Sequence, residues 1–268
     1  MPGLFTHAGQ SVRPILCVAI LLSALVPATA QQLRRATLWD LKLGEPIAAQ
    51  PSPDEFRGFA CGSNGGPPRQ PLSGWSDYGR CAAEADRLRE VYFEYDDEYE
   101  YIARAKDLPR EVARWAGTAE AGFPVIVSAL FDEPGVLRGI RVVTDPRPEY
   151  RNDLIEPELK KRADAYLFGA AMAARFGIDA ARDCTSLPTS EGESAVGTLF
   201  VKQSCQLVDT ARSRKIVVRQ NYFRKLGQSG VNPQLPTQLT QGQFESSARL
   251  EIRQSAPGRQ EPRIVTDR

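Results

Sequence analysis

Apolar and acidic side chains alternate between residues 91 and 105. The odd positions are mostly aromatic or aliphatic and the even positions mostly acidic: Val91, Phe93, Tyr95, Tyr99, Tyr101 and Ala103 against Glu94, Asp96, Glu98 and Glu100. Strict alternation predicts β-structure with one buried face and one solvated face. One long strand or a hairpin fits this pattern. We favour a hairpin with a three-residue turn at 96–98, because it pairs apolar residues across the two strands.

A second hairpin is predicted at 125–143. Its strands, 125–131 and 136–143, flank a run of turn-forming residues, Asp132-Glu133-Pro134-Gly135. Apolar residues occupy both faces of these strands, which indicates a central place in a sheet. Three later runs, at 198–207, 215–224 and 244–253, also have the composition of strands, and polar loops separate them.

The strongest helical pattern covers residues 157–176. Its apolar residues recur with the 3.6-residue period, and Gly177 ends it. Shorter helices are predicted at 76–90 and 109–116, and a short strand at 38–47.

Strands followed by a helix and more strands predict an α+β fold, with an antiparallel sheet in two lobes and a central helix at about 157–176. The expected parts are an acidic N-terminal lobe with two hairpins (31–156), a basic C-terminal lobe with a helix and three strands (157–253), and a disordered polar tail (254–268). The charges support this division, since 31–156 holds 16 basic and 22 acidic residues, and 157–268 holds 17 basic and 11 acidic residues. Such halves can face each other, or each can present a patch to a partner.

Residues 1–30 have the features of a cleavable signal peptide. Arg13 precedes an apolar run at 15–26, Pro27 follows the run, and Ala28-Thr29-Ala30 is a small-x-small cleavage pattern. The run is shorter than the ~20 apolar residues that span a bilayer. An uncleaved anchor helix and a lipid anchor at Cys17 fit the flanking residues less well. We therefore expect a mature chain that begins near Gln31, has no membrane span, and is periplasmic or secreted.

Four cysteines remain after cleavage. An even number of cysteines in an exported chain predicts disulfides. Spacings of about 20 residues favour Cys61 with Cys81 and Cys184 with Cys205 among the three possible connectivities. The chain has no CxxC motif, so neither a thioredoxin-like redox site nor a zinc ribbon is indicated.

The composition excludes several chemistries. The single histidine, His7, lies in the predicted signal peptide. Without histidine the mature chain has no Ser-His-Asp site, no Cys-His site and no histidine-rich zinc site. We predict no cofactor. The composition leaves three possibilities for the mature chain: carboxylate catalysis, Ser-Lys catalysis, or no catalysis.

Two charged clusters are candidate sites. The acidic one is a cation face of weak specificity, formed by Glu94, Asp96, Glu98 and Glu100 beside Asp97. Crowded carboxylates can bind calcium or raise one pKa for acid catalysis, but alternation alone also explains them as a solvated sheet face. The basic one is a possible partner patch of Arg212, Arg214, Lys215, Arg219, Arg224 and Lys225. It is suited to anionic envelope polymers, or it is a solvated face.

A glycine-rich loop occupies residues 61–68. Such loops cradle phosphate when they follow a strand and open a helix. Here two prolines follow, so a loop held by a disulfide at Cys61 is the simpler interpretation. Trp75 and Tyr78 are close to the loop in sequence and could stack on a sugar, whereas Trp39 and Trp115 fit a core equally well.

The run Ala60–Pro68 together with Glu90–Tyr101 resembles uncharacterised exported proteins of rhizobia-type bacteria. The resemblance extends to residues 124–145. It implies export and a bacterial envelope, and it implies no activity.

These observations favour a non-catalytic exported protein with a binding or structural role and assign no catalytic residue. An envelope protein or a polysaccharide is the expected partner, and nucleic acid is not. A carboxylate-dependent glycan hydrolase, which needs only two carboxylates, is one alternative. A calcium-stabilised structural module is the other.

Overall fold

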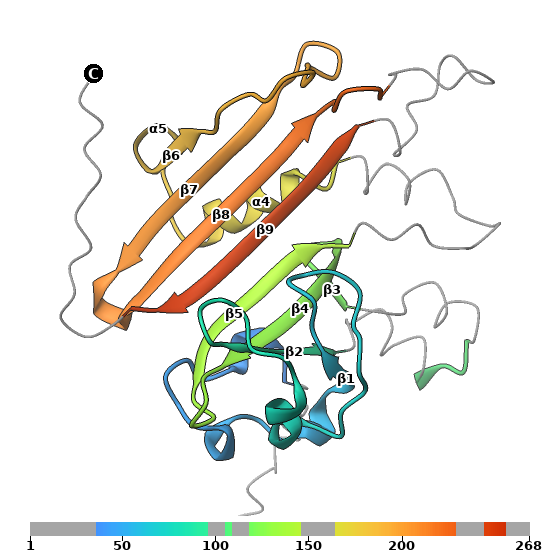
Figure 1. Ribbon diagram of the computed structural model, residues 1–268, viewed down its shortest axis with the longest axis vertical. Coiled ribbons are helices and arrows are strands. Elements are labelled where there is room, and N and C mark those ends of the chain that lie inside the picture. Colours follow the sequence, from blue (N-terminus) through green and yellow to red (C-terminus); the bar gives the residue numbers. More distant parts are fainter. Residues whose placement is uncertain (1–35, 96–104, 109–117, 146–163, 229–243, 256–268) are drawn as a thin grey trace, which may run out of the picture. The chain divides into compact units, whose positions relative to one another are not determined.

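The computed structural model describes residues 36–95, 105–108, 118–145, 164–228 and 244–255. The chain separates into two compact units, Met1–Arg34 and Arg35–Arg268, and all described residues belong to the second. Nine strands of this unit form one antiparallel sheet (Figure 1). They are β1 (Arg57–Cys61), β2 (Arg89–Glu94), β3 (Thr118–Glu120), β4 (Phe123–Phe131), β5 (Leu137–Thr144), β6 (Cys184–Ser186), β7 (Val201–Asp209), β8 (Arg214–Phe223) and β9 (Glu245–Gln254).

The strand order is β1-β2-β4-β5-β9-β8-β7-β6, and β3 pairs with β4. Since β5 occupies one edge of β4, both β2 and β3 must lie along its other edge, one after the other. The pairing of β5 with β9 joins the two halves of the chain, with Arg141 directly opposite Glu251.

This topology contradicts the predicted α+β fold in two lobes. The strands assigned to the two lobes form a single sheet, and no helix lies between them. The main helix, α4 (Leu167–Arg175), packs against β8 and β9, and the short α5 (Ala180–Asp183) lies against β7 (Figure 1). The prediction failed because the order of elements along the chain and the charge balance of its halves carry no information on which distant strands pair.

The two best-patterned groups of strands were predicted well. The hairpin expected at 125–143 is β4 and β5, and its central place between β2 and β9 is confirmed. The three later strands are β7, β8 and β9. A connection of four residues, including the 3-10 helix η5 (Thr210–Arg212), joins β7 to β8, where the predicted strand bounds left a longer polar loop at 208–214.

Several local predictions were wrong. Residues 76–90 form a 3-10 helix, η4 (Trp75–Arg80), followed by turns, and residues 38–47 begin with the 3-10 helix η1 (Leu38–Asp40) and form no strand. The helix expected at 157–176 is seen only as α4. The helix expected at 109–116, the returning strand after Glu98, the signal peptide and residues 256–268 lie outside the described residues.

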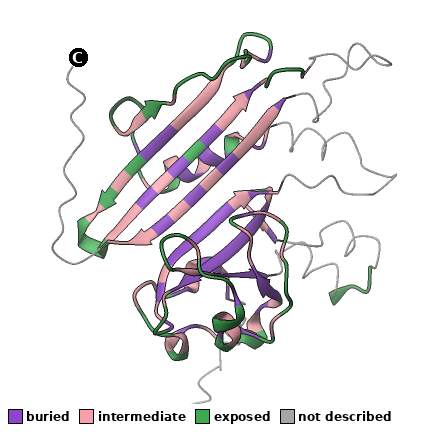
Figure 2. Ribbon diagram, viewed as in Figure 1, coloured by how far each residue is buried: buried purple, intermediate pink, exposed green. Residues whose placement is uncertain are grey.

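One face of the sheet, here called the core face, carries most of the core. Opposite pairs such as Val127 with Val142 and Ile216 with Ile252 share this face. Phe168 and Met172 of α4 belong to the same buried cluster. Figure 2 shows that β4 and β5 are almost continuously buried, whereas burial alternates along β8 and β9. β4 and β5 are therefore covered on both faces.

An aromatic cluster fills the core face over β1, β2 and β4. Trp75, 2% exposed, packs edge-on against Phe56, Phe59 and Phe93 with ring centroids 4.7–5.3 Å apart. Its Nε1–H donates to the carbonyl oxygen of Pro51 at 3.0 Å, so the indole is both buried and satisfied.

Two disulfides are present, as predicted. They join Cys61 to Cys81 and Cys184 to Cys205, the pairs that the spacing favours. The first ties the glycine-rich loop to η4, and the second fastens β6 to β7. Of the helices in the described part of the chain, none is long and apolar enough to cross a membrane.

Candidate functional site

The opposite face of the sheet, here called the polar face, holds a buried ion cluster centred on Arg141. The Arg141 side chain, on β5, is 2% exposed. Its Nη1 lies 2.6 Å from Glu84 Oε1 and 2.8 Å from Glu90 Oε2, and its Nε lies 3.1 Å from Glu251 Oε1. One guanidinium thus contacts three carboxylates, using donors fixed in one plane.

Strand register and one tight turn position these groups. Glu251 is directly opposite Arg141 on β9, and Glu90 is at the start of β2, on the far side of β4. Glu84 belongs to the turn before β2, which Arg87 closes with a left-handed backbone (φ 64°) and an amide that donates to the Glu84 carbonyl at 2.9 Å. Residues far apart in sequence therefore meet on one face.

Two further arginines extend the cluster along β9. Glu251 lies 2.5 Å from Arg249 and 3.3 Å from Arg253, and Arg253 also lies 3.0 Å from Asp86. Arg249 donates to the side chain of Asn64 at 2.6 Å. These contacts link β9 to the glycine-rich loop and to the turn before β2.

The glycine-rich loop binds a carboxylate of the protein itself. The amides of Asn64 and Gly65 donate to the two carboxylate oxygens of Glu90 at 2.5 and 3.2 Å. Both residues have positive φ (61° and 80°), which turns their N–H groups toward one side. At Gly62 a Cβ would lie 2.3 Å from Glu90 Cγ, so only glycine allows this approach. The amides that a phosphate would need are already bonded to Glu90.

Charge interactions keep this cluster ionised. The hydrogen bond from Arg141 lowers the pKa of Glu84, although partial burial acts in the opposite direction. Burial alone would raise the pKa of Glu251, but the charges of Arg253 and Arg249 outweigh it and lower that pKa to about 2. Burial likewise disfavours the charged form of Arg141, yet its carboxylate partners raise its pKa.

A general acid needs a carboxyl whose pKa is raised toward neutrality. The pKa shifts of Glu84 and Glu251 run the other way, because each carboxylate is paired with arginine. This cluster is therefore suited to holding the loop, the turn and the strands together, and it is poorly suited to proton transfer.

The predicted acidic face is only partly described. Glu94 is half-buried, lies 3.4 Å from Arg57 and accepts a hydrogen bond from the Tyr92 hydroxyl. Glu90 and Tyr92, on the same side of β2, are buried, so the expectation of a solvated face is wrong for this strand. Asp96, Glu98 and Glu100 lie outside the described residues. Within the described ranges, no group of three or more histidine, cysteine, aspartate or glutamate side chains could hold a metal ion.

The six basic residues of the predicted partner patch do not gather into one patch. Arg212 and Arg214 pair with Asp209 at the start of β8, and Arg224 and Lys225 follow its other end. Ten residues of strand separate the two ends, about 30 Å at ~3.3 Å per residue. Between them, Lys215 and Arg219 lie on the polar face, and Arg219 is exposed.

Trp75 and Tyr78, considered as sugar platforms, pack into the core, and Trp39, expected in the core, is only partly covered. Trp75 is buried, and Tyr78 packs against Phe131 and donates its hydroxyl to the Glu133 carbonyl. Trp39 is half-buried beneath the guanidinium of Arg175, which lies 3.8 Å from the ring centroid. Trp115 lies outside the described residues.

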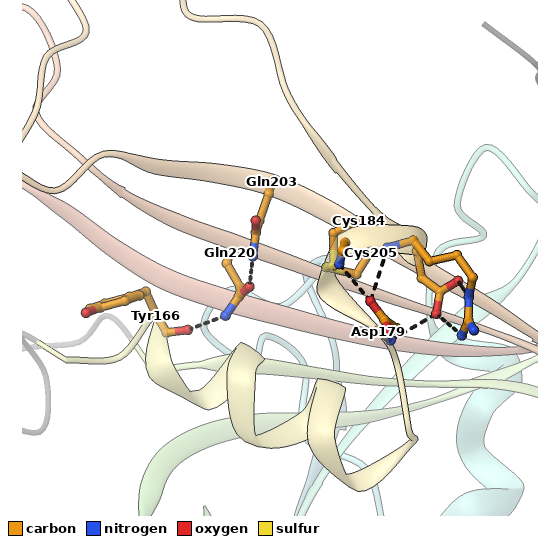
Figure 3. The surroundings of a disulfide bond; sticks show 9 residues. Tyr166, Asp179, Cys184, Gln203, Cys205 and Gln220 are labelled. Atoms are coloured by element: carbon orange, nitrogen blue, oxygen red, sulfur yellow. Dashed lines mark hydrogen bonds and ion pairs between the residues drawn. A yellow bond between two sulfur atoms is a disulfide. The ribbon is translucent and has the colours of Figure 1, made fainter.

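A different set of aromatic residues, here called the tyrosine cluster, lies at the end of the sheet. Tyr166, at the N-terminus of α4, packs against Tyr222 of β8 with ring centroids 4.5 Å apart. Phe244, which is buried, lies behind Tyr222 at 5.3 Å. Figure 3 shows Gln220 between Gln203 and Tyr166, donating to the Tyr166 carbonyl oxygen at 3.1 Å. Both tyrosines are half-buried, so the cluster reaches the surface.

Comparison with family models, with curated proteins and with solved structures finds no match to this chain. The functional argument therefore depends on the residues themselves.

Sequence patterns did not identify the residues that form these two clusters. Glu90 looks like the first even-numbered residue of a solvated face, and Arg141 looks like one polar residue in an apolar strand. The available signal was the glycine-rich loop, whose left-handed backbone presents amides to an anion. That the anion is Glu90 depends on strand pairing, which local patterns do not report.

Proposed function

We propose that this chain is an exported, non-catalytic protein of the bacterial envelope that binds a polysaccharide or an envelope protein. The observation that carries the proposal is the ion cluster around Arg141. It is the largest assembly of charged groups among the described residues, and each of its three central carboxylates is bonded to arginine. Pairing with arginine lowers the pKa of a carboxyl group, whereas a general acid needs a raised pKa, so this cluster does not favour acid catalysis.

Two features of the chain support export. The first 30 residues have the charge, apolar run and small-residue pattern of a signal peptide. Two disulfides fit an oxidising compartment such as the periplasm or the exterior. A protein stabilised in this way and presenting a half-buried tyrosine cluster is suited to contact with extracellular material.

The export part is tested by expressing the full chain in a Gram-negative host. Mass spectrometry of the periplasmic fraction should find a mature N-terminus at Gln31. As a matched control, Ala30→Tyr should block cleavage and leave the precursor with the membranes, because the residue before the cleavage site must be small. A wild-type chain that retains Met1 in the cytoplasm contradicts export.

The binding part is tested with the purified mature chain. It should sediment with isolated envelope material and release no reducing sugar from cell-wall or storage glycans. Turnover that disappears in Glu84→Gln or Glu251→Gln, with folding intact, would establish the hydrolase instead. A melting temperature raised by calcium and lowered by a chelator would favour the calcium-stabilised module.

A further inference from the structure

Two charged side chains, those of Asp164 and Arg224, lie beside the tyrosine cluster. Arg224 follows Tyr222 by two residues, and alternation along a strand places both side chains on the same face. Asp164 precedes Tyr166 by two residues, in a turn whose carbonyl accepts from the Leu167 amide at 2.8 Å. All four side chains are half-buried. The Asp164 carboxylate acts on the pKa of both tyrosines and the Arg224 guanidinium acts on that of Tyr222, so two stacked rings, one carboxylate and one guanidinium gather at this end of the sheet.

Arg224 has unused hydrogen-bonding capacity. Its Nε is buried and has no hydrogen-bond partner among the described residues. Its main chain is paired in both directions with Ser194, at 2.8 and 3.0 Å, so the residue itself is held in place. No ion pair joins Arg224 to Asp164 within the described ranges. A buried donor without a partner is uncommon in folded proteins and invites a ligand or water.

The platform under the rings is rigid. The Tyr166 amide donates to Ser246 Oγ at 3.3 Å, and its carbonyl accepts from Gln220. Gln220 in turn accepts from Gln203, as Figure 3 shows. α4 can lie this close because residue 169 is glycine, where a Cβ would be 2.3 Å from Gln220 Cγ. Rings held in this way lose little freedom on binding.

We propose that Asp164, Tyr166, Tyr222 and Arg224 form a binding site for a neutral glycan, which rests on the binding function proposed above. Sugar rings present apolar C–H faces that pack on aromatic side chains, and their hydroxyl groups both donate and accept hydrogen bonds. Asp164 supplies the acceptor, and Arg224 supplies the donor.

The charges of the cluster favour a neutral ligand over an acidic one. Burial raises the pKa of Tyr166, and the Asp164 carboxylate adds to this effect. The pKa of Tyr222 is also raised, first by burial and then by Tyr166 and Asp164, while Arg224 acts in the opposite direction. The rings thus lie within the fields of one negative and one positive group, which together offer an anionic sugar no net attraction.

The test measures affinity of the mature chain for oligosaccharides. Cellohexaose, maltohexaose and mannohexaose are the neutral probes, and hexagalacturonate is the acidic probe. Calorimetry should detect binding of at least one neutral probe. Arg224→Gln and Asp164→Asn should each weaken it about tenfold, the usual cost of losing a charge-assisted hydrogen bond. Tyr222→Phe should keep most of the affinity, because the ring remains.

The matched control is Arg219→Gln, on the same strand but on the opposite face, which should change affinity less than about twofold. Thermal melts of every variant separate lost binding from lost folding. Failure of all neutral probes, preference for hexagalacturonate, or equal loss in Arg219→Gln would each overturn this site. If one of these outcomes occurs while the wild type and all variants still sediment with envelope material, the site is wrong but the proposed function stands. If nothing sediments, the proposed function fails as well.

Discussion

Replacing Arg141 by methionine should destabilise the fold strongly. Methionine keeps much of the apolar stem of the side chain but removes the charge from the centre of the cluster. Glu251 would still contact Arg249 and Arg253, and the Glu84 side chain, 24% exposed, would still reach water. Glu90, 3% exposed, would lose its only arginine partner among the described residues and keep two loop amides. The net effect is therefore one uncompensated buried carboxylate.

Removing one member of a buried ion pair costs about 3–5 kcal/mol of folding free energy. We expect Arg141→Met to fall in this range in equilibrium unfolding by urea at pH 7. With a denaturant slope of ~2–3 kcal/mol/M, the urea midpoint should fall by about 1–2.5 M. Arg219→Met, on the exposed part of the same face, is the matched control and should change stability by less than ~0.5 kcal/mol.

A second substitution identifies the cause. Adding Glu90→Gln to Arg141→Met should recover part of the lost stability, because the amide carries no charge to leave unpaired. A loss below ~1 kcal/mol in the single variant, or no recovery in the double variant, would refute a stabilising role for the ion cluster.

Three other outcomes are expected. The pKa of Glu251 is about 2 in the fold and ~4.3 in an unfolded chain, so its contribution to stability is fully present above about pH 4.3 and is lost as the pH falls toward 2. Below pH 4.3 the melting temperature of Glu251→Gln should therefore decline less steeply than that of the wild type. Replacing both Cys184 and Cys205 by serine should cost ~3 kcal/mol in the chain-entropy model, measured by urea unfolding, and an unchanged midpoint would contradict it. Gly65→Ala should lower the melting temperature, because a φ of 80° is strained for alanine and the new Cβ would lie 2.4 Å from Val143 Cγ2 of β5. The control is Gly79→Ala, which has no atom within 4 Å of the new Cβ and should change the melting temperature little.

The strands were predictable where the pattern is local. Both faces of 125–131 and 136–143 are apolar, and the turn residues between them fix a hairpin, so β4 and β5 were placed correctly. The helix expected at 76–90 failed for a local reason that the apolar spacing hides. Cys81 is bonded to Cys61, and Arg87 adopts a left-handed backbone, so the segment follows turns although its apolar residues are spaced like those of a helix.

The candidate sites were less predictable than the strands, because each depends on long-range pairing. Arg141 and Glu251 are 110 residues apart in sequence and become neighbours only when β5 pairs with β9. Tyr166 and Tyr222 meet because α4 packs on β8. In each case the residue types are ordinary for a helix or strand surface, and only the sheet order makes them a cluster.

The same pairing explains why charged residues belong in the middle of this sheet. β5 is buried on both faces, so its apolar residues alone would specify its register against β9 only weakly. With β5 held by β4, a shift of one residue in β9 would turn Glu251 toward the core face, where Val142 lies, and would leave Arg141 opposite an apolar residue of β9. The direct opposition of Arg141 and Glu251 therefore penalises the wrong register more than it stabilises the right one, which is the best-supported role of buried polar groups. On this argument Arg141→Met combined with Glu90→Gln and Glu251→Met should be more stable than Arg141→Met alone but should form a less uniform sheet, seen as broader amide resonances along β5 and β9. Sharp, wild-type-like spectra from that triple variant would show that the apolar residues of the core face set the register by themselves.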